Sequence, residues 1–93
     1  MVVGILKIDL FIPDSTSLKV KRSAIKSLKD RLTSRFNVSV AEVEHNDKWQ
    51  RASLGVAVVS NDGTHVESML GKVMNLVYGD RRVEVIETTI TYV

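Results

Sequence analysis

The chain has 93 residues, of which 44% are hydrophobic and 26% charged, with a formal net charge of +2 and no cysteine. This length and composition are those of one small globular domain over residues 1–93, and no apolar run is long enough to span a membrane. The lack of cysteine excludes disulfides, thiolate metal sites and cysteine nucleophiles.

The first predicted element is a strand over residues 2–12, where the side chains alternate in character. The even positions are apolar or glycine, whereas the odd positions include Lys7 and Asp9, so one face is expected to be buried and the other partly wet. These charges and the lack of a basic leader make the segment a poor signal peptide, and we expect a cytoplasmic protein. Pro13 ends the strand because it has no ladder N–H, and the polar DSTS turn offers helix N-caps.

A helix is predicted over residues 18–36, because Leu18, Ile25, Leu28, Leu32 and Phe36 recur there with the helical period. Residues 38–44 and 51–60 are β-branched and alternating, and the turn residues between them predict a β-hairpin. Apolar residues over 66–77 mark a second amphipathic helix, which Gly79 is expected to end in the left-handed conformation. Residues 82–93 are again rich in β-branched side chains and predict the last strand.

The predicted order is therefore strand, helix, strand, strand, helix, strand. This order is typical of the ferredoxin-like α+β fold, in which two helices cover one face of a four-stranded antiparallel sheet. Two right-handed crossovers within such a sheet give the strand order 4-1-3-2. The other face of the sheet is then expected to remain open.

Charge is distributed unevenly along the chain. Residues 18–36 hold seven of the 13 lysines and arginines and one acid, whereas the remaining residues hold six bases and ten acids. At about 100° per residue, four bases of the predicted helix form one stripe at the border of its apolar face: Lys19, Arg22, Lys26 and Lys29. A basic face on an otherwise acidic domain points to a polyanion or to an acidic protein surface, with solubility as the alternative.

Lys21 falls in the middle of the apolar arc of the same helix. Its stem could cover the core edge while the amine reaches solvent. The amine could instead pair with a sheet carboxylate from Glu42, Glu44 or Asp9, and we favour this pairing. A third interpretation is an anion site that joins the backbone N–H groups of residues 17–20 to Lys19, Lys21 and Arg22.

Patterns for catalysis and cofactor binding are absent from the sequence. It has no nucleophile elbow, Walker loop or G-x-G-x-x-G motif, and His45 and His65 have no sequence-evident nucleophile partner. No spacing suits a metal. Glu42 and Glu44 are predicted to share one strand face, where we expect them to be solvated or paired with bases rather than to act as an acid–base pair. We therefore expect no enzyme, no cofactor and no metal.

The open face of the predicted sheet is expected to be smooth. Its third strand has no aromatic residue, so base stacking of the kind found in RNA-recognition domains is not expected there. We predict instead a homodimer through this face, with pairing along residues 38–44 as the alternative route. Trp49 lies beside a turn, where it either caps the core, which we favour, or is an exposed anchor for a partner. The predicted interface residues are Ile5, Phe11, Ala57, Val59 and Trp49.

Three stretches, SLKVKR, FNVSVAEV and DKWQRA, resemble the YlxP-like family of small bacterial proteins of uncharacterised function. The resemblance covers nearly the whole chain and implies a ferredoxin-like fold. The family's genes often lie near those of translation and ribosome-maturation factors, which implies RNA- or ribosome-linked work by association, and the family brings no catalytic residues. We expect a non-enzymatic module that binds RNA or the ribosome through the basic helix. The alternative is a homodimeric protein-interaction module that uses the open sheet face.

Overall fold

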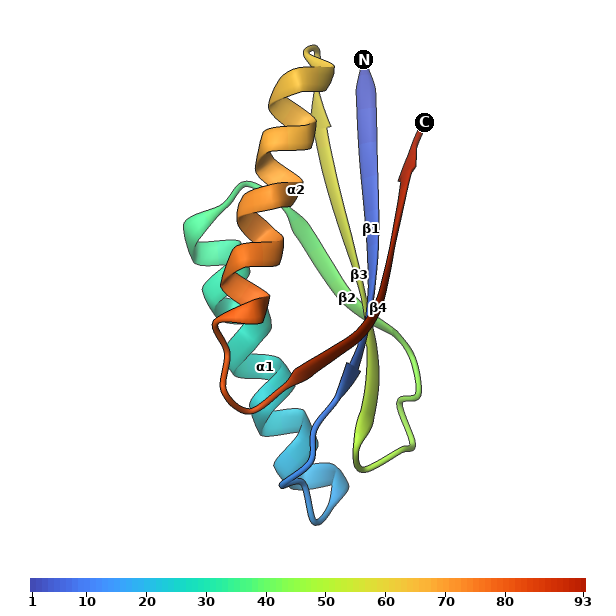
Figure 1. Ribbon diagram of the computed structural model, residues 1–93, viewed down its shortest axis with the longest axis vertical. Helices are drawn as coiled ribbons and strands as arrows, with labels where there is room; N and C mark the ends of the chain where they lie inside the picture. Colours follow the sequence, from blue (N-terminus) through green and yellow to red (C-terminus); the bar gives the residue numbers. More distant parts are fainter.

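The computed structural model describes residues 1–93 and contains four strands and two helices (Figure 1). The strand pairs are all antiparallel, and the sheet order β2-β3-β1-β4 is the predicted order read in reverse. The prediction of a ferredoxin-like α+β fold is therefore confirmed. In chain order the elements are β1 (Val2–Phe11), α1 (Leu18–Arg35), β2 (Ser39–Glu44), β3 (Arg51–Ser60), α2 (Gly63–Tyr78) and β4 (Glu84–Tyr92).

The core lies between the helices and the two central strands. Figure 1 shows α1 and α2 on one side of the sheet, with β4 along the edge away from α1. The alternation predicted for β1 and β3 is observed, because the even positions of both strands point toward the helices. The core therefore combines sheet and helix residues, among them Leu6, Ile8, Leu10, Leu54, Val56, Leu28, Leu32, Val66 and Val73.

The helices begin at polar caps and end in different ways. Ser17 caps α1 by accepting a hydrogen bond from the Val20 N–H, and Asp62 caps α2 in the same manner from the Thr64 N–H. Gly79 ends α2 as expected, but its φ of −78° is right-handed, so the predicted left-handed cap is wrong. The chain instead leaves α2 through a further turn, in which the Asp80 N–H donates to the carbonyl of Val77.

A β-bulge changes the direction of the acidic side chains on β2. Glu42 stands opposite Leu54 and Glu44 stands opposite Ser53, so Val43 is an extra residue in β2. Leu54 and Ser53 are neighbours in β3 and point to opposite faces of the sheet, and therefore Glu42 and Glu44 do so as well. The prediction that these two carboxylates share one face is wrong, because simple alternation does not hold across the bulge.

The helix α2 packs very close to β1 at Gly4. A Cβ atom at this position would lie 2.4 Å from Cγ1 of Val66 and 3.0 Å from Cδ1 of Leu70. Carbon atoms in ordinary contact are about 3.5–4.0 Å apart. The close approach of the helix to the sheet therefore requires glycine at position 4.

Candidate nucleic-acid interface

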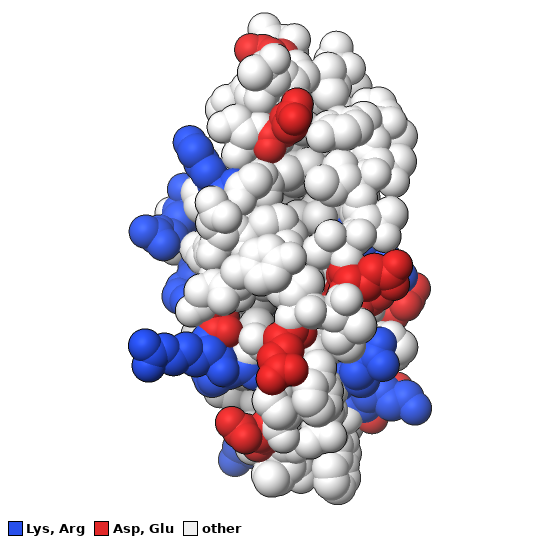
Figure 2. Space-filling view, viewed as in Figure 1, with Lys and Arg blue, Asp and Glu red and all other residues white.

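The outer side of α1 carries the predicted basic stripe, Lys19, Arg22, Lys26 and Lys29. The first three side chains are exposed and Lys29 is half-buried. Figure 2 shows lysines and arginines gathered along the left-hand side of the molecule, where the two helices lie. Lys26 pairs with Asp30 one turn away at 2.8 Å, and this hydrogen bond raises the pKa of Lys26. The other three bases of the stripe form no ion pair, so their charges are available to a partner.

Lys21 has a structural role at the start of α1. Its side chain is fully buried, and its ammonium donates to Oε2 of Glu42 at 2.9 Å. The same group reaches the backbone carbonyls of His45 at 2.8 Å, Asn46 at 3.2 Å and Arg51 at 3.3 Å. The predicted carboxylate partner is confirmed, and the predicted escape of the amine to solvent is wrong. Because three N–H donors already face four acceptors, Lys21 does not belong to an anion or nucleic-acid site.

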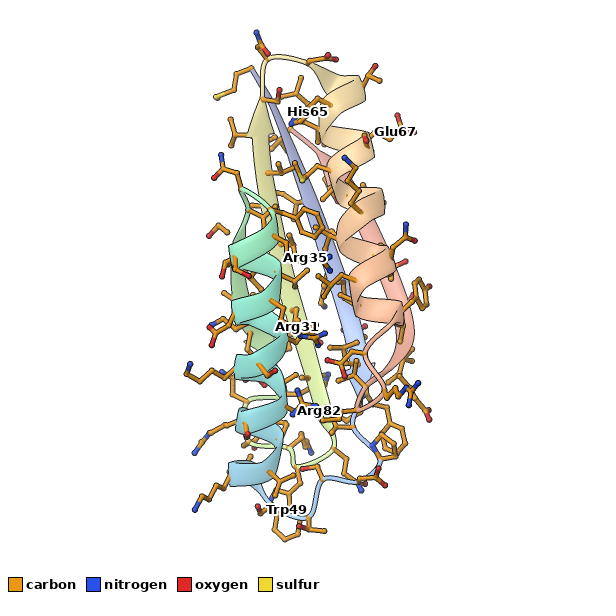
Figure 3. The ribbon with its side chains drawn as sticks, turned by 90° about the vertical axis from the view of Figure 1, so that its left-hand side faces the viewer. Arg31, Arg35, Trp49, His65, Glu67 and Arg82 are labelled. Atoms are coloured by element: carbon orange, nitrogen blue, oxygen red, sulfur yellow. The ribbon has the colours of Figure 1, made fainter.

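The β2–β3 loop, residues 45–50, is held against the start of α1. Lys21 binds two of its carbonyls, the Ile12 N–H donates to the carbonyl of Gln50 at 2.9 Å, and Nε2 of Gln50 donates to the carbonyl of Pro13 at 3.0 Å. His45 turns the loop with a φ of 63°. Trp49 in this loop is 56% exposed, so the favoured interpretation as a cap over the core is wrong. Figure 3 shows Trp49 at the lower end of the molecule, by the start of α1.

Two other arginines near the helices hold the fold together. Asp80 is buried, and its carboxylate accepts hydrogen bonds from the guanidinium of Arg31 and from the backbone N–H of Arg82. Figure 3 places Arg31, Arg35 and Arg82 along the groove between the helices. These contacts of Asp80 were not predicted, although one acid among the bases of the segment Gly79–Arg82 was an available signal in the sequence. Arg31 is therefore engaged within the protein, unlike most of the basic stripe.

The open face of the sheet is divided into an apolar end and a polar end. Ile5 pairs with Ala57, and Val59 lies on the same face, with exposed fractions of 39% for Ile5 and 59% for Val59. The ion pair between Lys7 and Glu44 at 2.9 Å crosses the middle of the face. Phe11 lies beyond it, opposite Arg51 and Glu84. The four predicted interface residues of the sheet therefore do not form one patch, and Trp49 belongs to the loop instead.

The structure brings the histidines to no shared site. His45 lies in the β2–β3 loop, and His65 lies in the first turn of α2 at the other end of the molecule (Figure 3). No three histidine, aspartate or glutamate side chains come together in a way that could hold a metal ion. Neither of the two helices has the length and apolar character needed to cross a bilayer.

Fold and surface together define a class, a small ferredoxin-like domain with a basic first helix. The de novo designed protein LFR1 1 with ferredoxin fold aligns with 100% of this chain and 84% of its own, at a TM-score of 0.58 and 12% identity. The de novo designed protein Foldit4 aligns with 98% of this chain and 97% of its own, at 0.58 and 15% identity. These similarities bear on the fold alone.

The chain belongs to the DUF503 family, described as proteins of unknown function, whose sequence profile matches residues 3–90. It is 38% identical over 72 residues to the uncharacterized protein YlxP of Bacillus subtilis (strain 168). That alignment covers 77% of this chain and 78% of the relative. The resemblance to YlxP-like proteins, drawn from three short motifs, is therefore confirmed.

Proposed function

We propose that this domain is a non-enzymatic module that binds RNA through the basic stripe of α1. The observation that carries the proposal is that Lys19, Arg22 and Lys29 line one side of a helix without an acidic partner. Surfaces that serve only solubility intersperse charges of both signs, whereas α1 presents almost only bases. The ribosome-linked setting implied by the family resemblance agrees with an RNA ligand.

The stripe suits a phosphate backbone because it is extended and held on a rigid element. Its four bases span ten residue steps, which is about 15 Å along a helix axis. Underneath, Leu28 and Leu32 are fully buried and fix α1 on the sheet. Lysine and arginine in such an array bind phosphates largely without regard to base sequence, and they release counterions as they do so.

The proposal predicts a specific change in salt dependence. Replacing Lys19, Arg22, Lys26 and Lys29 together with glutamine is expected to leave the fold intact and to weaken binding of a single-stranded RNA oligomer. Because each phosphate contact on a single strand contributes a slope of about 0.7, the plot of log affinity against log salt should become flatter by about 3. Fluorescence anisotropy of a labelled oligomer between 50 and 200 mM salt, the range over which such contacts show most clearly, measures both quantities.

A charge-matched control separates the stripe from net charge. Lys19→Gln with Arg22→Gln removes two charges from the stripe, and Lys72→Gln with Arg81→Gln removes two exposed charges from outside it. The first pair should reduce affinity and slope much more than the second. Equal effects would mean that the domain attracts RNA only by its net charge, and an unchanged affinity in the quadruple variant would rule the stripe out.

A second candidate function is homodimeric protein interaction through the apolar end of the open sheet face. Val93 exchanges backbone hydrogen bonds with Val3 at 2.8 and 2.9 Å, which places its side chain beside the same end of the face. Val59 and Val93 are 59% and 69% exposed, and Ile5 lies beside them. Neighbouring exposed apolar side chains favour a protein partner over solvent alone.

This second candidate predicts a dimer at micromolar concentration that Ala57→Lys disrupts, as measured by sedimentation equilibrium. A monomer at every concentration would contradict dimerisation altogether. A dimer that tolerates Ala57→Lys would point to a sheet edge. The bulged and acidic β2 is a protected edge, whereas β4 has no charge from Thr88 onward, so Ile90→Lys would then be expected to break the dimer.

A further inference from the structure

The start of α1 lies between two surface hollows. One of them, of about 500 Å³, is lined by Ser15, Thr16, Lys48, Trp49, Gln50 and Arg51. The other, of about 490 Å³, contains Lys19 and Arg82 in its lining, and Ser15 lines both hollows. Trp49 and Lys19 therefore lie on either side of Ser15, in the segment that leads into α1. We call the first hollow the Trp49 hollow.

The exposure of Trp49 is not explained by packing. Tryptophan is the largest apolar side chain and gains most from burial, yet its indole is more than half exposed in this chain. The backbone that carries it is nevertheless held in place, because Lys21 and Gln50 tie the loop to α1 and to the segment before it. A flat ligand can therefore bind the ring without the cost of first ordering this loop, which favours affinity.

The chemistry of the lining suits a nucleotide. Lys48 and Arg51 bring two positive charges beside the ring, and no acidic residue lines the Trp49 hollow. Nε of Arg51 is the single buried side-chain nitrogen or oxygen that has no hydrogen-bond partner in the structure. An aromatic ring beside cations is the arrangement with which proteins hold single-stranded nucleic acid, since bases stack on the ring and phosphates meet the charges.

We propose that the Trp49 hollow binds one unpaired base of RNA, stacked on the indole, while Lys48 and Lys19 contact the phosphates on either side. This inference rests on the proposed function of the basic stripe and specifies its ligand as single-stranded RNA. A base within a duplex is stacked on both of its faces, so the indole can reach only an unpaired one. The following phosphates of the RNA then contact the basic stripe along α1.

Trp49 is the only tryptophan, so its fluorescence reports on this hollow alone. We expect a ten-nucleotide oligouridine to quench the emission of the full chain, and an abasic oligomer with the same number of phosphates to leave it nearly unchanged. Trp49→Ala is expected to weaken anisotropy-measured binding of labelled oligouridine about tenfold, whereas Trp49→Phe retains most of the affinity. The salt slope should stay the same in both variants, because neither removes a phosphate contact.

Each way in which the expectation can fail has a different meaning. Binding of oligouridine with no quenching and no loss in Trp49→Ala would overturn the base site and leave the basic stripe intact. Equal quenching by the abasic oligomer would overturn stacking, since phosphates alone would then account for the change. If the wild-type chain binds no oligonucleotide at all, the proposed function fails together with this inference.

Discussion

Replacing Lys21 with methionine is expected to lower the free energy of unfolding by about 3 kcal/mol, because a buried charge loses its partner. Glu42 and three backbone carbonyls all accept hydrogen bonds from the Lys21 ammonium. The side chain of Glu42 keeps 16% of its exposure, so water can partly solvate the orphaned carboxylate. This places the loss at the lower end of what breaking a buried ion pair costs. Chemical denaturation followed by circular dichroism measures the change.

Two further variants test the cause of this loss. Lys19→Met removes an exposed lysine from the same helix, and it should change the free energy of unfolding by less than about 0.5 kcal/mol. Combining Lys21→Met with Glu42→Leu removes the orphaned charge but not the orphaned carbonyls, so only part of the loss should be recovered. A Lys21→Met variant as stable as wild type would show that the buried pair contributes nothing.

Gly4→Ala is expected to destabilise the protein by about 2 kcal/mol, because the added methyl group overpacks the contact between β1 and α2. The new Cβ would lie 2.4 Å from a methyl carbon of Val66, which is β-branched and cannot turn away easily. The helix or the strand must therefore shift. Thermal and chemical unfolding of the variant measure the effect.

The same substitution elsewhere in the chain is expected to have the opposite sign. Gly71 lies within α2, and nothing comes within 4 Å of the position that its Cβ would occupy. Gly71→Ala should therefore stabilise the protein by about 0.5–1 kcal/mol, the helix-propensity difference between the two residues. Val66→Ala removes the methyl groups that clash, so the Gly4→Ala, Val66→Ala double variant should be less destabilised than the sum of the two single variants. Additive losses would mean that the clash is not at Val66. A neutral Gly4→Ala would contradict the tight packing.

Much of the fold could be predicted from periodicity. Alternation in β1 and β3 and the helical period of α1 are local properties, and the structure ends these elements within one residue of the predicted ends. The order of elements then leaves few arrangements of the sheet, since crossover connections are right-handed. The basic stripe was also predictable, because about 100° per residue determines which side chains share a side of a helix.

The partners of individual side chains could not be predicted in the same way. Three acids were candidate partners for Lys21 from the sequence alone, and only the packing of α1 beside β2 selected Glu42. The bulge at Val43 turned Glu44 to the other face, where it meets Lys7. Asp80 likewise forms a hydrogen bond with Arg31, which is 49 positions away in the chain. Such contacts depend on registers between segments that are distant in sequence.

By itself the sequence determined the element order, the buried faces and the basic stripe of this protein. All three depend on geometry that repeats within a single helix or strand, so a residue's spacing from its neighbours decides its direction. Only the tertiary structure decided that Lys21 forms a buried ion pair with Glu42 and that the Lys7–Glu44 ion pair divides the open sheet face. It also decided that Trp49 is exposed beside the start of α1. These features arise where a bulge and a loop interrupt the repeat, and there the long-range contacts determine where each side chain lies.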